Sequence, residues 1–203
     1  MTQQGKNAID LVLAESLIEL SAKKPIDKIT IKEITDKAGV IRPTFYNHFQ
    51  DKYELIEWII KSELLEPIKP LLNAGMIFEA IVLMLNNISA NSVFYKKALK
   101  LEGAVTFNQI AMKCVYEMFM NIINEKSTGK KSKYRWLTPE VISTYYAQSL
   151  CFITEGWIAQ GMDDIEPKEM AEAYMYLITR SMDDILSCLL YTSPSPRDYA
   201  ASR

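Results

Sequence analysis

The chain has 203 residues, of which 49% are hydrophobic, and a formal net charge of −2 at pH 7. This apolar fraction is enough for a packed core, and the charge argues against indiscriminate binding to polyanions. The single histidine, His48, leaves no His-based catalytic triad and no His metal cluster, and a Gly-rich phosphate loop is absent from the sequence. We therefore expect no enzyme, no catalytic residue, no metal and no cofactor.

Composition also predicts the fold class and the compartment. Gly and Pro are scarce, and runs of β-branched residues with a period of two are absent, which predicts an all-α fold. No stretch of 18 uncharged residues occurs, and residues 1–10 are polar, so we expect neither a membrane span nor a signal peptide. Three cysteines, an odd number, lie in helical patterns and indicate reduced, buried residues of a cytoplasmic protein.

The first predicted helix runs from about Asn7 to Ala22. Its apolar side chains recur at helical spacing along one stripe, which consists of Ile9, Val12, Leu13, Leu17 and Leu20. The helix breaks at Pro25. Ile26 and Ile29 then anchor the connection to the next helix.

A short helix is predicted after Thr30. Thr30 and Glu33 have the T-x-x-E spacing of a capping box, and Ile31, Ile34 and Ala38 share one face. Gly39 suits the left-handed conformation that ends a helix. This first helix therefore stops in a tight turn.

A second short helix begins near Arg42, because Pro43 fits only the first turn of a helix. At about 100° per residue, one side of this helix is predicted to be core. That side holds Ile41, Phe45 and Phe49, with His48 at its edge. The other side holds Arg42, Pro43, Tyr46 and Asn47, with Thr44 between the two. Arg pairs with guanine or phosphate, Asn with adenine, and Tyr and Thr hydroxyls with phosphate oxygens.

A third helix follows at once and links this unit to the rest of the chain. Asp51 is its predicted N-cap, paired with Glu54. We expect the helix to run over 51–65. Pro67 and Pro70 end it.

The run A-G-V-x-R-x-T-x-Y-x-H-F-x-D-K-x-x-L over 38–55 resembles the DNA-binding signature of the TetR family of bacterial transcriptional regulators. The match covers about the first 65 residues. The pattern F-Y-x-H-F-x-D-K-Y-x-L-x-x-W-I is similar to that of the dihydroxyacetone-kinase regulators within the family. The resemblance implies an N-terminal three-helix helix-turn-helix domain and a C-terminal helical ligand-binding and dimerisation domain.

The resemblance implies phosphate contacts for His48 and for Lys52 at the start of the linking helix. Taken alone, His48 could instead cap a helix C-terminus, Tyr46 could be ordinary packing, and Lys52 could be a solvated lysine. The predicted DNA-binding residues are Thr30, Arg42, Pro43, Thr44, Tyr46, Asn47, His48 and Lys52. One departure stands out: Ile41 occupies a position where many family members carry Ser or Thr, so the helix cap must come from elsewhere.

Helices are predicted in the body at 76–90, 92–102, 104–126, 138–161 and 167–190. Thr138 and Pro139 form a helix start. The helices 104–126 and 138–161 are rich in Met and aromatic residues, which pack cores and also line pockets for apolar ligands. The resemblance implies an effector pocket, for which the candidates are Phe107, Met112, Tyr116, Phe119, Tyr145, Gln148 and Phe152.

These patterns divide the chain into three parts: the DNA-binding domain at 1–50, the helical effector-binding and dimerisation domain at 51–190, and a disordered tail at 191–203. Residues 1–52 carry net charge +1 and residues 53–190 carry −4, the expected sign for a DNA-binding head on an acidic body. The Ser/Pro-rich tail resembles translated adapter sequence at the ends of environmental gene fragments.

The leading hypothesis is a regulator that binds a double-stranded DNA operator as a homodimer and responds to an unknown small-molecule effector, without a membrane partner. A homodimer is expected because one helix-turn-helix reads too little DNA, and the helices 138–161 and 167–190 carry excess apolar surface. The alternative is a co-regulator that binds a partner protein through its helical body.

Overall fold

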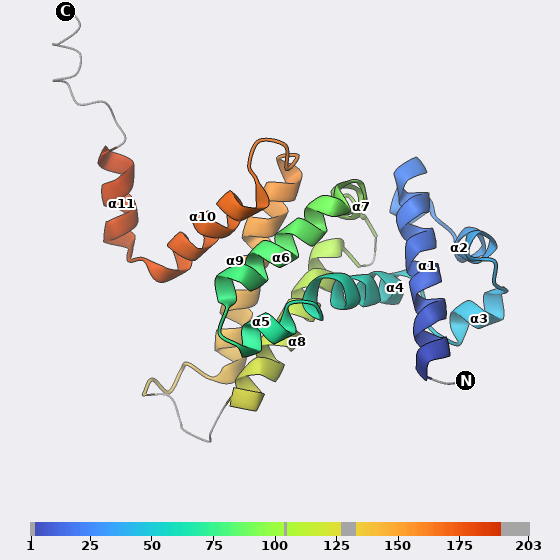
Figure 1. Ribbon diagram of the computed structural model, residues 1–203, viewed down its shortest axis with the longest axis horizontal. Helices are drawn as coiled ribbons and strands as arrows, with labels where there is room; N and C mark the ends of the chain where they lie inside the picture. The colour runs from blue at the N-terminus through green and yellow to red at the C-terminus, as the bar shows by residue number, and fades with distance from the viewer. Residues whose placement is uncertain (1–2, 104, 127–132, 192–203) are drawn as a thin grey trace, which may run out of the picture.

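The computed structural model describes residues 3–103, 105–126 and 133–191, and every regular element in these ranges is helical. The predicted all-α class is therefore confirmed. The N-terminal elements form a compact head at one end of the molecule (Figure 1). They are α1 (Gln3–Lys23), the 3₁₀ turn η1 (Ile26–Lys28), α2 (Ile31–Ala38) and α3 (Arg42–Tyr46).

The linking segment runs from the head into the body (Figure 1). It begins as α4 (Lys52–Ile59) and continues as a π-helical segment, η2 (Ile60–Leu65). The sequence predicted one regular helix over 51–65. Asp51 is the N-cap as predicted, since its carboxylate accepts hydrogen bonds from the backbone N–H groups of Tyr53 and Glu54 at 2.8 and 2.9 Å.

The body contains two long helices that pack along each other, α8 (Phe107–Lys126) and α9 (Pro139–Ala159). α10 (Pro167–Thr179) packs against α6 (Ile77–Ala90). Thr138 caps α9 as predicted, with its hydroxyl accepting from Val141 N–H at 3.4 Å. The remaining helices are α5 (Lys69–Asn73), α7 (Ser92–Ala98) and α11 (Met182–Tyr191).

One continuous core runs through the head, the linking segment and the body. Its fully buried members include Leu17 and Phe45 in the head, Leu55 and Ile59 on α4, and Trp157 on α9. The head also contacts the body directly, because α1 packs on α7 and Lys97 Nζ donates to the Ala22 carbonyl at 2.9 Å. The head and the body therefore contact each other directly as well as through the linking segment.

Two predicted helices are shorter than expected. The helix predicted over 92–102 ends at Ala98. The helix predicted over 167–190 breaks at Arg180, whose backbone is extended. Ser181 and Asp184 then form a reciprocal cap for α11, with Asp184 N–H donating to Ser181 Oγ at 3.2 Å and Ser181 N–H donating to Asp184 Oδ2 at 3.2 Å. This S-x-x-D signal was present in the sequence.

Among the described residues, no single helix is long and apolar enough to cross a membrane; the pair α6 and α7, bent by 88°, passes the test by length and composition only. The predicted tail at 191–203 lies outside the described residues, apart from Tyr191, which ends α11.

Candidate nucleic-acid interface

The turn between α2 and α3 is built from two local devices. Thr30 and Glu33 form the predicted capping box: Thr30 N–H donates to Glu33 Oε2 at 2.9 Å, and Glu33 N–H donates to Thr30 Oγ1 at 3.3 Å. Gly39 ends α2 with a φ of +68°, the left-handed conformation predicted for it. Thr30 is exposed, but its hydroxyl is engaged in the cap.

The Glu33 carboxylate also forms an ion pair with a residue outside the capping box. Lys24 Nζ lies 2.5 Å from Glu33 Oε1. The hydrogen bond from Lys24, followed by those from Thr30, lowers the pKa of Glu33 from its usual 4.5 to about 2. The Lys24 contact was not predicted, because Lys24 lies nine residues before Glu33, outside the local capping pattern.

α3 presents one apolar and one polar side. Phe45 is fully buried and packs its ring against Phe49, with centroids 5.9 Å apart. On the opposite side Arg42, Pro43 and Asn47 are exposed, and Tyr46 is 52% exposed. Thr44 is half-buried between the two sides. The outward polar face predicted from the sequence is therefore present, with hydrogen-bonding groups that are available to base edges and phosphates.

The prediction that Ile41 belongs to the core is wrong. Ile41 is 68% exposed and serves as the N-cap of α3, with φ −86° and ψ 153°. Its backbone is extended rather than helical, so the helical periodicity used to place it does not apply at this position. The side chain supplies no capping hydrogen bond, as expected for an isoleucine.

The His48 side chain is engaged inside the head, and its contact with phosphate stays a prediction. The His48 imidazole is 2% exposed, and its Nδ1 donates to Asp10 Oδ1 at a distance of 2.6 Å. Asp10 lies on α1 and its side chain is 7% exposed. In this conformation His48 ties α3 to α1 and does not present its ring to a phosphate.

Lys52 has a similar internal role. Its ammonium donates to the carbonyls of Ile26, Asp27 and Ile29 at 3.0, 2.7 and 3.1 Å. These three bonds use all three N–H donors of the group. Burial lowers the pKa of Lys52 and the charge of Asp27 opposes that effect. In this structure Lys52 therefore connects α4 to the η1 turn, and its contact with the DNA backbone stays a prediction.

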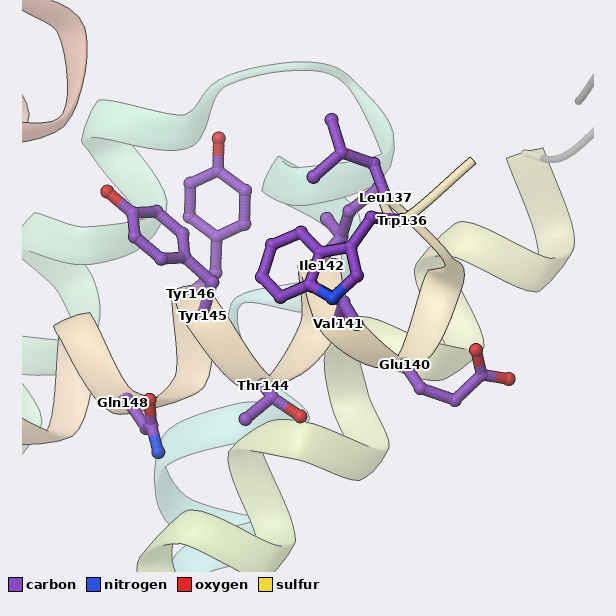
Figure 2. Close-up of a pocket in the computed structure, with 9 residues that line it drawn as sticks. All are labelled: Trp136, Leu137, Glu140, Val141, Ile142, Thr144, Tyr145, Tyr146 and Gln148. Atoms are coloured by element: carbon purple, nitrogen blue, oxygen red, sulfur yellow. The ribbon is translucent and has the colours of Figure 1, made fainter. Parts of the chain in front are cut away.

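The seven candidate effector residues are distributed over several places in the body instead of surrounding one cavity. Phe107 is buried, and Met112, Tyr116 and Phe119 are partly buried against the core. Tyr145 and Gln148 line an open groove of about 740 Å³ at the start of α9 (Figure 2). Phe152 is 77% exposed at the edge of a second groove.

Of these seven residues, Phe107 lines a small, partly open cavity between the linking segment and α6, α8 and α9. The cavity has a volume of about 40 Å³. Its apolar lining includes Ile60, Leu64, Leu65, Met84, Ala111, Val115, Leu150 and Ile158. Thr154 also lines it, and the Thr154 hydroxyl is buried without a hydrogen-bond partner among the described residues. The η2 residues that line this cavity were not predicted as pocket residues, because the spacing of residues within one helix does not show which helices pack together.

A head with this capped turn and this outward polar face has the geometry of a helix-turn-helix DNA-binding unit, and a helical body follows it. Residues 15–59 match the family model described as "Bacterial regulatory proteins, tetR family", and residues 76–180 match "Transcriptional regulator C-terminal region". The chain belongs to the TetR family and is a DNA-binding transcriptional regulator. The resemblance in its sequence is confirmed.

Among its relatives is the "HTH-type dhaKLM operon transcriptional activator DhaS" of Lactococcus lactis subsp. lactis (strain IL1403), which is 26% identical over 152 residues, covering 74% of this chain and 79% of the relative. A solved structure of "Dihydroxyacetone kinase operon activator DhaS" aligns with a TM-score of 0.60 at 21% identity, over 84% of this chain and 93% of that one. NalD, "the secondary repressor of MexAB-OprM multidrug efflux pump in Pseudomonas aeruginosa", aligns with a TM-score of 0.56 at 12% identity, over 85% and 96%. Both structural likenesses show the fold.

Proposed function

We propose that the chain binds a specific DNA operator as a homodimer in the cytoplasm, that a small-molecule effector controls this binding, and that the protein acts by binding and not by catalysis. The observation that carries the DNA-binding part is the outward face of α3. Arg42 and Asn47 are exposed one and a half turns apart, and Phe45 beneath them is fully buried. The buried ring fixes the direction in which the polar side chains point.

Within this face, Arg42 and Asn47 are the proposed readers of bases, and Tyr46 is a proposed phosphate contact. Thr30, Pro43 and Thr44 complete the proposed DNA-binding surface. Selection of operators from a randomised library, followed by gel shifts, tests these roles. Arg42→Ala and Asn47→Ala should relax base preference by about 1–3 kcal/mol per lost bidentate contact.

Tyr46→Phe should weaken binding to every sequence to a similar degree, because a phosphate contact carries no sequence information. Lys100→Ala is the matched control for Arg42→Ala, since it also removes a positive charge, but from an exposed lysine of the body. Unchanged affinity and sequence preference in all three α3 variants would refute the assignment of the outward face.

The proposed dimer surface lies on α9. Tyr145 and Phe152 are 61% and 77% exposed and are seven residues apart, so they lie on one side of the helix two turns apart. Leu177 on α10 is 45% exposed. Family members usually bind operators as dimers. Light scattering should give twice the chain mass, and Phe152→Asp should lower it, whereas Asn124→Asp at an exposed position on α8 should not.

The proposed effector site is the partly open cavity bounded by η2, α6, α8 and α9. Its lining is apolar apart from the unpaired Thr154 hydroxyl and Glu155, whose carboxylate accepts a hydrogen bond from Asn108, and it suits a small, largely apolar molecule that carries a hydrogen-bonding group. A thermal-shift screen should yield binders that change DNA affinity by a factor on the order of 5–150. Thr154→Val should weaken those binders that carry the polar group and leave fully apolar binders unaffected.

The second candidate is a co-regulator that binds a partner protein through its body. The groove in Figure 2 favours it, because Trp136 and Tyr145 are 75% and 61% exposed beside an apolar surface. A footprint obtained with the pure protein separates the two functions. A protected operator without any added protein supports the leading proposal, and protection that requires a second protein supports the alternative.

A further inference from the structure

Four charged residues alternate in sign across the contact between the linking segment and α8. Glu57 Oε1 lies 2.7 Å from Lys61 Nζ, and Glu57 Oε2 lies 2.8 Å from Lys113 Nζ. Lys61 Nζ also lies 2.8 Å from Glu117 Oε2. We refer to Glu57, Lys61, Lys113 and Glu117 as the α4–α8 ion network.

The network joins two separate elements twice. Glu57 is in the last part of α4 and Lys61 is in the first turn of η2, whereas Lys113 and Glu117 are one turn apart on α8. Two of the three ion pairs, Glu57–Lys113 and Lys61–Glu117, therefore cross the contact, and the third runs along the linking segment. Two crossing bonds one turn apart restrict both sliding and rotation of one helix against the other.

The network is partly shielded from solvent. The Glu57 side chain is 20% exposed and those of Lys61 and Glu117 are each 39% exposed, whereas that of Lys113 is 56% exposed. Burial alone would raise the pKa of Glu57, but hydrogen bonds from Lys113 and Lys61 outweigh it and hold that pKa below its usual value. Burial likewise opposes the rise in the pKa of Lys61 that its bonds to Glu117 and Glu57 cause. Hydrogen bonding to oppositely charged partners therefore favours the charged forms of Glu57, Lys61 and Lys113.

The linking segment and α8 also line the partly open cavity proposed as the effector site. Ile60 and Leu64 on η2 and Val115 on α8 face the cavity, and each lies within four residues of a member of the network. Cys114 Sγ lies 3.9 Å from the Glu57 carbonyl, which places α8 directly against the end of α4. Any change in the cavity that moves η2 against α8 must stretch or re-pair the network.

We propose that the α4–α8 ion network sets the angle of the linking segment on the body, and so sets the separation of the two recognition helices in the dimer. Its four members are positioning residues and not DNA contacts. This inference rests on the proposed function, since it requires a dimer that reads two half-sites. A displacement of η2 at the cavity would then be transmitted to the heads through these ion pairs.

The spacing between half-sites is a readout that a purely stabilising role would not change. Operators would be selected from a library in which the half-site sequence is fixed to the one chosen by the wild-type dimer, and the spacer length and sequence are randomised. The variants are Glu57→Gln, Lys113→Gln, their double mutant and Lys61→Met. Each keeps the size of the side chain approximately and removes its charge.

We expect the variants to broaden or shift the preferred spacer length and to keep the half-site sequence. Affinity for the wild-type operator should fall by no more than about fivefold per protomer, which is the upper stability contribution of one exposed ion pair expressed as a ratio of equilibrium constants. The double mutant Glu57→Gln/Lys113→Gln should lose less than the sum of the two single losses. Lys113→Arg, which keeps the charge, should retain the wild-type spacer.

Glu66→Gln is the matched control. It breaks a 2.5 Å ion pair with Lys69 that does not reach α8, so its spacer preference should equal that of the wild type. Wild-type spacer preference in all charge-removing variants, with or without a loss of thermal stability, would overturn the inference. A wild-type protein that selects no operator would instead overturn the proposed function, so the two failures are distinguishable.

Discussion

The hydrogen bond between His48 and Asp10 allows a decisive test of how the head is held together. It connects α3 to α1 over 38 residues of sequence, at 2.6 Å, with both side chains less than a tenth exposed. Asp10→Ala would leave the Nδ1–H of His48 buried without an acceptor. An unsatisfied buried donor costs about 1–3 kcal/mol of stability, which corresponds to a loss of roughly 2–12 °C in melting temperature for a chain of this size.

The companion variants distinguish the roles of the two side chains. Asp10→Asn should cost less than Asp10→Ala, because its amide oxygen can still accept the hydrogen bond. His48→Ala should be destabilising as well, and the double mutant Asp10→Ala/His48→Ala should fall well short of the sum of the single effects. Urea denaturation followed by circular dichroism would measure all four free energies of unfolding.

The opposite pattern would refute this assignment. If His48 contacted phosphate, His48→Ala would weaken DNA binding without loss of stability, and Asp10→Ala would leave DNA binding intact. Free energies of unfolding within about 0.5 kcal/mol of the wild type for both single mutants, the range of ordinary surface changes, would show that the bond does not hold α1 to α3.

Three further predictions concern the same head. Lys52→Met, which removes three hydrogen bonds to the η1 turn, should lower the free energy of unfolding by about 1–3 kcal/mol in urea titrations, whereas Tyr46→Phe should leave it within about 0.5 kcal/mol. Ile41→Ser should raise it by about 1 kcal/mol, because the extended N-cap of α3 lacks a side-chain acceptor. The pKa of Glu33 is lowered to about 2, so its contribution should be present above pH 4.5 and lost as the pH falls towards 2. The melting temperatures of wild type and Glu33→Gln should therefore converge in that window, and a constant difference would contradict the assignment.

Much of the head could be predicted because its signals are local. The capping box at Thr30 and Glu33, the left-handed Gly39 and the N-cap at Asp51 each depend on residues within one turn of each other. The burial of Phe45 followed from periodicity alone. The burial predicted for Ile41 was wrong because helical periodicity applies only to residues inside a helix. Phe45 lies inside α3, whereas Ile41 precedes it.

The roles of His48 and Lys52 could not be predicted, since their partners are 38 and 23–26 residues away. The family resemblance implied that both side chains contact DNA, whereas in the structure their N–H groups donate to acceptors within the head. The body shows the same limit on a larger scale. Met and aromatic residues on α8 and α9 were recognised as possible pocket residues, whereas the cavity is formed where η2, α6, α8 and α9 meet. The π-helical geometry of η2 had no signal in the spacing of its apolar residues.

The size of the cavity bears on how regulation would operate. About 40 Å³ has room for only about three water molecules, since each needs roughly 10–15 Å³ of such space, so an effector must enlarge the cavity to bind. η2 is the wall of this cavity that belongs to the linking segment, and its π-helical turn departs from the regular α-helical pattern. Binding at this cavity would therefore favour a conformation in which η2 has moved, and the free energy available for changing DNA affinity equals the difference in effector affinity between the two conformations. Leu64→Ala, which enlarges the cavity from the η2 side, should accordingly raise effector affinity and reduce the effect of the effector on operator binding. An increase in both would show that the effector opens the cavity at another wall.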